Sequence, residues 1–195
     1  YIDKRADNGM LECYYSLYQQ NNDMVGWIKI PDTPVDYPVV KYSDNEFYLH
    51  KNFNKEYQFS GIPFLDYQSN DESVNKIIYA HNMKNGTMFA SLADYEDKSF
   101  YDAHKNIMYD TLYDKGEYEI VYAFTTKVGA SNEFKYYNYA DIESEERFNE
   151  YVTQAKSRSF YDTGVNTVYG DSLITLSTCA YHTSNERFVV IARKK

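Results

Sequence analysis

Short runs of apolar and β-branched residues, separated by turn residues, make up most of the chain after residue 24. Runs of this kind, with Pro, Gly, Asp and Asn between them, are typical of the strands of a barrel or sandwich. We expect strands at 26–30, 35–42, 62–67, 76–80, 117–126, 172–178 and 187–192. The pattern therefore predicts a mostly β fold, with helices in the connections.

Helical spacing of apolar residues replaces the strand pattern in a few places. Residues 9–22 carry apolar side chains at i, i+3 and i+4, namely Met10, Cys13, Tyr14, Leu17 and Tyr18. This spacing predicts an amphipathic helix, with Cys13 as a small buried residue on its apolar face. Further helical segments are expected at 44–50, 87–95 and 144–157.

The length of the chain sets its domain organisation. A chain of 195 residues, 43% of them hydrophobic, can bury one core and is shorter than chains whose cores usually split. We expect a single domain over 1–195, with a helical extension at 1–24 and a β-rich body at 25–195. The chain starts with Tyr1 rather than Met, so we expect that a preceding segment, which could hold a signal or membrane anchor, has been removed.

Charge and cysteine content exclude several classes of protein. The net charge of -9 would repel a phosphate backbone, so we expect no nucleic-acid binding. Two widely separated cysteines, Cys13 and Cys179, give neither a disulfide framework nor a zinc motif, and a single bridge between them is the less favoured alternative. No apolar run approaches the ~20 residues that a membrane-spanning helix needs.

Cys179 is the first candidate for chemistry. It ends the alternating run Leu173–Cys179, in which residues 173, 175, 177 and 179 are expected to share one face. The strand-like run beginning at Arg187 follows after seven residues, and antiparallel pairing would bring Arg187 beside Cys179. A guanidinium there could stabilise the oxyanion formed when a thiolate attacks an amide, whereas the alternative is an exposed cysteine near a surface arginine.

A nucleophilic thiol also needs an acid–base partner, and histidine is the usual one. His81 directly follows the apolar run Ile77–Ala80, so it is expected at a strand end, where a rigid element presents it. His50 and His104 lie in polar segments and are expected to be solvated, and His182 lies in the loop after Cys179. We therefore predict a trio of Cys179, His81 and Arg187.

At these residues the chain resembles the class B sortases. Residues 175–179, Thr-Leu-Ser-Thr-Cys, match the T-L-x-T-C signature of sortases, and Arg187 falls where the family has its essential arginine. Residues 79–83, Tyr-Ala-His-Asn-Met, are similar to the histidine segment of the family. The helical N-terminus and the long connection containing residues 144–157 resemble class B in particular.

The resemblance implies an eight-stranded β-barrel and a cysteine transpeptidase that cleaves a C-terminal sorting motif of secreted proteins, of the N/S-P-x-T-G/N type. Cys179 would attack the threonine carbonyl, His81 would protonate the departing amine, and Arg187 would hold the oxyanion or the substrate carbonyl. An amine of a peptidoglycan precursor would then resolve the acyl-enzyme. No metal or organic cofactor is implied, and the full-length protein is expected at the extracellular face of the membrane, anchored through the missing segment.

The resemblance also suggests substrate contacts. Ser177 and Tyr79 each lie two residues before a proposed catalytic residue, and Asn45 and Leu49 resemble a substrate-contacting segment of class B members. Ordinary packing or capping is the alternative for each of these four residues.

Two other classes of protein are alternatives to a sortase. A papain-like hydrolase would carry its cysteine at the start of a helix and its histidine downstream, which is not the order seen here. A non-catalytic surface module could use the 23 tyrosines as binding platforms for peptide or carbohydrate. Turnover of a peptide substrate that depends on Cys179 would separate the sortase from the binding module.

Overall fold

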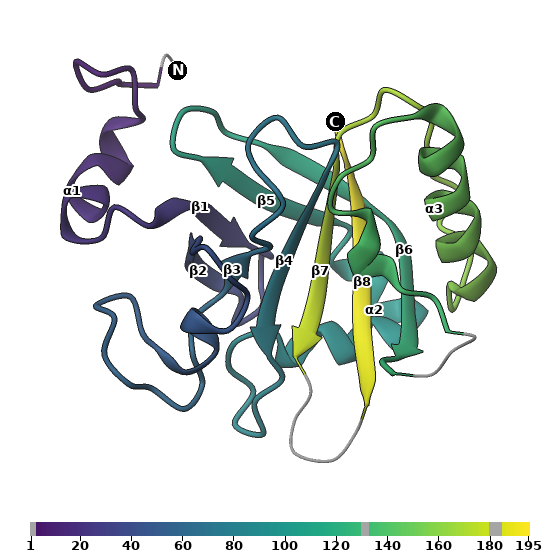
Figure 1. The fold of residues 1–195 in the computed structure, drawn as a ribbon. Helices are drawn as coiled ribbons and strands as arrows, with labels where there is room; N and C mark the ends of the chain where they lie inside the picture. The colour runs from purple at the N-terminus through teal and green to yellow at the C-terminus, as the bar shows by residue number, and fades with distance from the viewer. Residues whose placement is uncertain (1–2, 130–132, 180–184) are drawn as a thin grey trace.

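Eight strands close into a barrel in the computed structural model, which describes residues 3–129, 133–179 and 185–195 (Figure 1). Around the barrel the strand order is β1-β2-β3-β4-β7-β8-β6-β5. The strands are β1 (Met24–Lys29), β2 (Asp36–Val40), β3 (Phe64–Leu65), β4 (Asn75–His81), β5 (Asn106–Thr111), β6 (Glu117–Lys127), β7 (Leu173–Cys179) and β8 (Glu186–Lys194). The mostly β class and the eight-stranded barrel are confirmed.

Two of the strands differ from the pattern in the sequence. The expected strand at 62–67 contracts to Phe64–Leu65, because the chain turns away on both sides of this pair. Strand β5 was not predicted at all. Its two buried residues, Ile107 and Tyr109, alternate with half-exposed ones in a largely polar stretch, which hides the strand signal.

The described residues form three α-helices and three 3₁₀ helices, of which the first precedes the first strand and the others lie in connections between strands. The α-helices are α1 (Glu12–Gln20), α2 (Lys98–Ala103) and α3 (Glu145–Arg158), and the 3₁₀ helices are η1 (Phe47–His50), η2 (Ala90–Glu96) and η3 (Tyr136–Tyr139). The expected helices at 44–50 and 87–95 are thus short 3₁₀ turns, and α2 and η3 were not predicted. In the described part of the chain, no helix is long and apolar enough to cross a membrane.

Helix α1 packs beside the barrel and exposes Cys13. Leu11 and Tyr14 are buried, and Leu17 and Tyr18 pack against them. Cys13 is the residue before Tyr14, about 100° around the helix from it, and therefore points away from this buried face. The expectation that Cys13 is buried is therefore wrong, since its side chain is exposed.

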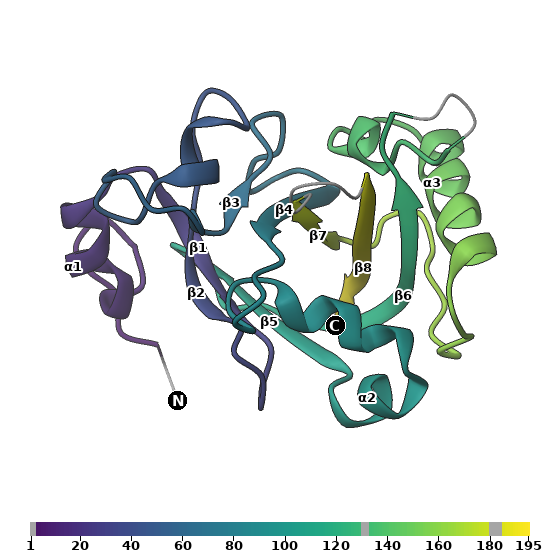
Figure 2. The same ribbon diagram turned by 90° about the horizontal axis from the view of Figure 1, so that it is seen from below.

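The strands β4, β6, β7 and β8 are covered on both faces. Ile174 and Leu176 of β7 point into the barrel core, whereas Leu173 packs in a second cluster with Phe148 and Tyr151 of α3. Figures 1 and 2 show α3 outside this part of the barrel, on the side opposite α1. Ser144 caps the start of α3, where its side chain accepts a hydrogen bond from the Arg147 N–H.

The pairing of β7 with its two neighbours brings the predicted trio to one end of the barrel. β4 and β7 run parallel, and the last pair in their register is His81 with Cys179. β7 and β8 are antiparallel, as the hairpin expectation requires, with Ser177 opposite Val189. The β7–β8 pairing ends there, and continuing its register by two residues would bring position 187 opposite position 179.

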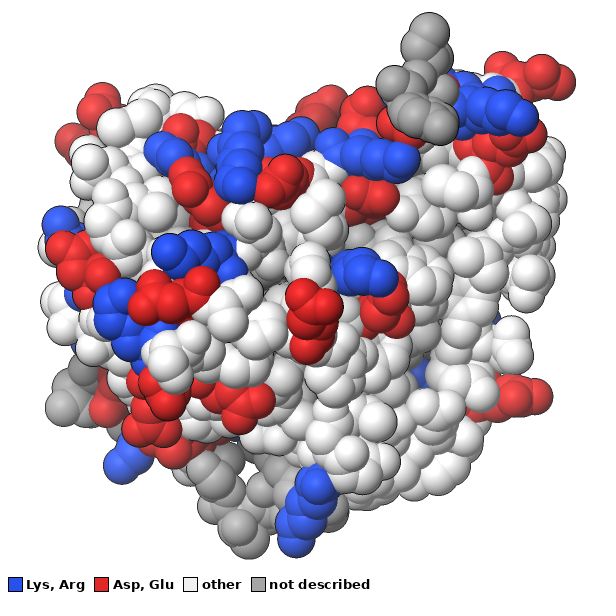
Figure 3. All heavy atoms as spheres, turned by 180° about the vertical axis from the view of Figure 1, so that it is seen from behind, with Lys and Arg blue, Asp and Glu red and all other residues white. Residues whose placement is uncertain are grey.

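The surface carries interleaved charges of both signs. On the face shown in Figure 3, basic side chains lie next to acidic ones. Exposed ion pairs of this kind include Lys29–Asp36, Lys98–Asp102 and Lys195–Glu117. Pairs this exposed contribute little to stability.

Candidate active site

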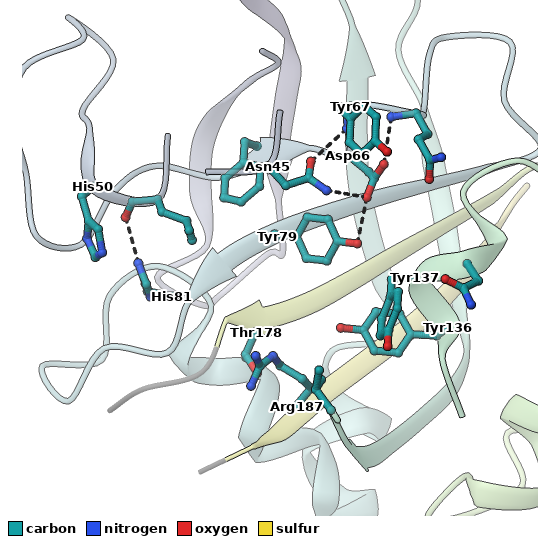
Figure 4. A pocket seen from close by; sticks show the side chains of 15 residues that line it. Asn45, His50, Asp66, Tyr67, Tyr79, His81, Tyr136, Tyr137, Thr178 and Arg187 are labelled. Carbon is teal, nitrogen blue, oxygen red and sulfur yellow. Dashed lines mark hydrogen bonds between the residues drawn. The ribbon is translucent and has the colours of Figure 1, made fainter. Parts of the chain in front are cut away.

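A pocket of about 670 Å³ lies at the barrel end where β4 and β7 finish (Figure 4). Two walls face each other across it. The histidine wall comes from β4, η1 and the turn after β3, and consists of Asn45, Leu49, His50, Phe64, Asp66, Tyr67, Gln68, Tyr79 and His81. The arginine wall comes from η3 and the ends of β6, β7 and β8, and consists of Val128, Tyr136, Tyr137, Asn138, Thr178 and Arg187.

His81 ends β4 and is held by the last two residues of η1. Its Nε2 lies 2.8 Å from the carbonyl oxygen of Leu49. A carbonyl oxygen only accepts, so Nε2 carries a hydrogen and Nδ1 is the nitrogen that can exchange a proton. The ring of His50 stacks on that of His81, with centroids 5.3 Å apart and an interplanar angle of 21°.

Buried polar contacts fix η1 in place. Tyr48 is 1% exposed, and its hydroxyl donates to Asp23 and accepts from Asn21. Burial and the neighbouring Asp23 raise the pKa of Tyr48, so the phenol keeps the proton that it donates. Gly61 passes directly beneath with φ at 57°, and a Cβ there would clash with the carbonyl oxygens of Tyr48 and Leu49.

A buried carboxylate organises the rest of the histidine wall. Asp66 is 2% exposed and accepts hydrogen bonds from Asn45 Nδ2 and the Tyr79 hydroxyl, each at 2.9 Å. Its other oxygen accepts from the backbone N–H of Gln68, also at 2.9 Å. Asn45 Oδ1 in turn accepts from the Tyr67 N–H. Two predicted substrate contacts, Asn45 and Tyr79, are thus oriented by one carboxylate (Figure 4).

Arg187 lies near the start of β8 and lines the pocket opposite His81. The hydroxyl of Thr178 accepts a hydrogen bond from the Phe188 N–H at 3.0 Å, which ties the end of β7 to the start of β8. Among the described lining residues, Arg187 is the one lysine or arginine. A guanidinium here can donate to an oxyanion formed near the end of β7.

Ser177 does not line the pocket, although its position was expected to. The residue is fully buried at 0% exposure, and its hydroxyl forms a 2.6 Å hydrogen bond with that of Tyr136. The outer face of β7 is covered by η3 and α3 as far as Ser177, so the side chains of Leu173, Thr175 and Ser177 pack against protein. Ser177 supports the arginine wall from behind, whereas Asn45, Leu49 and Tyr79 do line the pocket.

The backbone of Cys179 is placed by the pairing of β7 with β4, while its side chain and residues 180–184, including His182, lie outside what the structure describes. Neighbouring strands lie about 4.8 Å apart. The register therefore brings the backbones of residues 81 and 179 side by side.

Two residues of the site were missed in the sequence. His50 is exposed, as expected for a residue in a polar segment, but it also lines the pocket and stacks on His81, which the sequence did not indicate. Asp66 lies inside the strand expected at 62–67, and only the earlier end of β3 at Leu65 places it at a strand end, so the sequence pattern did not mark it as a site residue. His104 lies outside this pocket and stacks on Phe100.

No three His, Cys, Asp or Glu side chains gather as a metal site in the residues that the structure describes. The lining of the pocket is instead made of aromatic rings, amides, hydroxyls and two oppositely charged groups. Such a surface suits an extended, mostly uncharged peptide.

Comparison with known proteins agrees with this arrangement. Residues 28–195 match the sortase domain family. The chain is 39% identical to Sortase B of Listeria monocytogenes over 165 residues, which are 84% of this chain and 65% of that protein. It therefore spans slightly less than two thirds of that relative.

Two solved structures show the same fold. A Staphylococcus aureus sortase B–substrate complex superposes with a TM-score of 0.86 at 33% identity, covering 93% of this chain and 84% of that one. A sortase B complexed with triglycine gives a TM-score of 0.85 at 32% identity, covering 93% and 85%. The chain belongs to the sortase family. Its similarity to these class B members confirms the class B resemblance.

Proposed function

We propose that the protein is a class B sortase enzyme that cleaves a sorting motif of the N/S-P-x-T-G/N type after its threonine and transfers the acyl group to an amine. The observation that carries the proposal is the β4–β7 register, which pairs His81 with Cys179 at the edge of a peptide-sized pocket. A sortase B has been solved with a substrate, which supports a peptide as the partner.

In the proposed reaction, the Cys179 thiolate attacks the carbonyl carbon of the threonine. The resulting oxyanion is stabilised by Arg187, and the C–N bond then breaks as His81 gives a proton to the departing amine. An acceptor amine attacks the thioester, loses a proton to His81, and releases Cys179 as the thiolate. The β4–β7 register and the pocket lining support these roles, because His81, Arg187 and the backbone of residue 179 lie at the same end of the barrel.

We propose a peptidoglycan precursor as the source of the acceptor amine, and the outer face of the cell membrane as the location. Another sortase B forms a complex with triglycine, a short peptide that carries a free amine, and this supports an amine acceptor. Fractionation of cells that express the full-length protein tests the location. Recovery in the cytosolic fraction alone would contradict it.

The activity is tested with a quenched peptide that carries S-P-x-T-G, with and without triglycine as an added amine. We expect cleavage by the parent, a triglycine-ligated product in mass spectra, and no turnover by Cys179→Ala. Cys13→Ala is the matched control, because its thiol is exposed on α1, away from the pocket, and we expect it to remain active. Turnover that survives in Cys179→Ala, or peptide binding without turnover in the parent, would favour the binding module.

A further inference from the structure

His50 and His81 form a face-to-face pair in which each ring has a fixed hydrogen bond to the backbone. His81 Nε2 donates to the Leu49 carbonyl at 2.8 Å, and His50 Nδ1 donates to the Phe59 carbonyl at 2.9 Å. Because a carbonyl oxygen only accepts, each bond selects one tautomer. The nitrogen that can gain or lose a proton is therefore Nδ1 in His81 and Nε2 in His50.

The stack extends outward from the pocket through aromatic side chains. Phe59 stacks on His50 at 5.8 Å, and Tyr57 lies 6.4 Å away at a tilt. One residue of η1, Leu49, accepts the hydrogen bond of His81, and the next, His50, covers a face of its ring. Rotation of the His81 ring would break the hydrogen bond and the stack together.

Two stacked imidazoles also interact through charge. A neutral ring accommodates a protonated neighbour, whereas two protonated rings at 5.3 Å repel each other. Other titratable groups on the surrounding elements include Tyr48 and Lys51 on and after η1, Asp66 after β3, Tyr79 and Lys84 on and after β4, and also Tyr57, Cys179 and Arg187. The ammonium of Lys51 lies over the Phe47 ring, 4.9 Å from its centroid.

We propose that His50 is a positioning residue for His81, which holds the ring in its reactive orientation and whose own protonation opposes protonation of His81. The positioning role rests on the proposed transpeptidase activity, while the charge coupling can be measured without it. His50 itself touches no reacting atom in the proposed reaction. Its contribution is to hold one orientation and one charge state of the residue that transfers the proton.

The coupling is measured by NMR titration of the histidine ring protons in Cys179→Ala protein, with resonances assigned by single substitutions. His50→Phe keeps an aromatic ring in the stack and removes the charge. We expect His81 to titrate about half a pH unit higher in His50→Phe than in its parent, the shift expected for two charges 5.3 Å apart in a water-like dielectric. His104→Phe is the matched control, because His104 also stacks on an aromatic ring and bonds a backbone carbonyl, and should leave the His81 titration unchanged.

The positioning role is measured by peptide cleavage with His50→Ala and His50→Phe. We expect His50→Ala to lower kcat about tenfold with little change in KM, since the ring of His81 loses one support. His50→Phe should recover most of that loss because it restores the stack. Identical His81 titrations with and without His50, or equal kcat losses in the two variants, would overturn the proposal. Absence of cleavage by the parent would instead refute the proposed function and leave the titration result standing.

Discussion

The two walls of the pocket are built in different ways. In the histidine wall, a buried carboxylate and two backbone carbonyls fix the orientation of Asn45, Tyr79, His81 and His50. In the arginine wall, two hydroxyl contacts from β7, Ser177 to Tyr136 and Thr178 to Phe188, hold the elements that carry the lining residues. In the histidine wall, hydrogen bonds hold the lining side chains themselves. In the arginine wall, they hold the strands and the turn that carry the lining side chains.

The largest expected effect of a wall residue is that of His81, which belongs to the more rigid wall. His81→Ala removes the proposed proton donor, so kcat should fall by about 10² to 10⁴-fold. Peptide cleavage by His81→Ala, His182→Ala and the distant control His104→Ala checks this. A dead His182→Ala beside an active His81→Ala would reverse the assignment.

Arg187 tests whether the opposite wall contributes to the rate or to binding. If the guanidinium stabilises the oxyanion, Arg187→Ala should lower kcat by about 10²-fold or more. Arg187→Lys keeps the charge but not the planar fork, and should recover only part of the loss. Steady-state kinetics with the peptide decides the matter, because a change confined to KM would mean that Arg187 holds substrate.

Asp66 tests the idea that the histidine wall owes its rigidity to one carboxylate. Asp66→Asn puts an NH2 group in place of one carboxylate oxygen, so either Asn45 and Tyr79 together or the Gln68 N–H lose their hydrogen bond to residue 66. The bonds that remain go to a neutral acceptor and are weaker than those to a carboxylate. We expect KM to rise about tenfold with a smaller change in kcat, because binding and not proton transfer is affected. An unchanged KM in the same assay would show that the orientation of these two residues does not matter for the peptide.

Ser177 should have the smallest effect, and on stability more than on rate. Ser177→Ala removes the buried hydrogen bond between the Ser177 and Tyr136 hydroxyls, so the free energy of unfolding should fall by about 1–2 kcal/mol. Urea denaturation of the parent, Ser177→Ala, Tyr136→Phe and the double variant measures the coupling energy of the two hydroxyls. We expect the double variant to lose less stability than the sum of the two single losses. A large rise in KM with unchanged stability would restore the role in substrate binding that the burial of Ser177 argues against.

Strands with a strong pattern were predictable, and the elements without one were not. The β7 run was predicted at 172–178 and is found one residue later, because its β-branched and apolar residues allow few alternatives. Strand β5 and helix η3 were missed because polar residues and tyrosines give no clear period there. The closure into eight strands came from the family resemblance, and the pairing of β4 with β7 could not be read from residues nearly 100 positions apart.

The site residues, like the strands and helices, were predictable only where the local sequence pattern indicated them. His81 was predicted from its place at the end of an apolar run, and the structure puts it in the pocket wall. His50 could not be predicted, because its role depends on the stack with His81, 31 positions away. Ser177 was misplaced because alternation tells which residues share a face, but not that η3 and α3 cover it.

The parallel register of β4 and β7 sets the His81–Cys179 pair independently of how many residues lie between its two members. Residues 82–172, which include α2, α3, β5 and β6, lie between the two members of the His81–Cys179 pair. Loops within that stretch can grow, shrink or exchange without changing which residues face each other, provided that the two strands keep their pairing. A one-residue slip would instead turn position 81 from the pocket into the barrel. The connections can therefore vary in length and sequence, while the sheet keeps residues 81 and 179 next to each other.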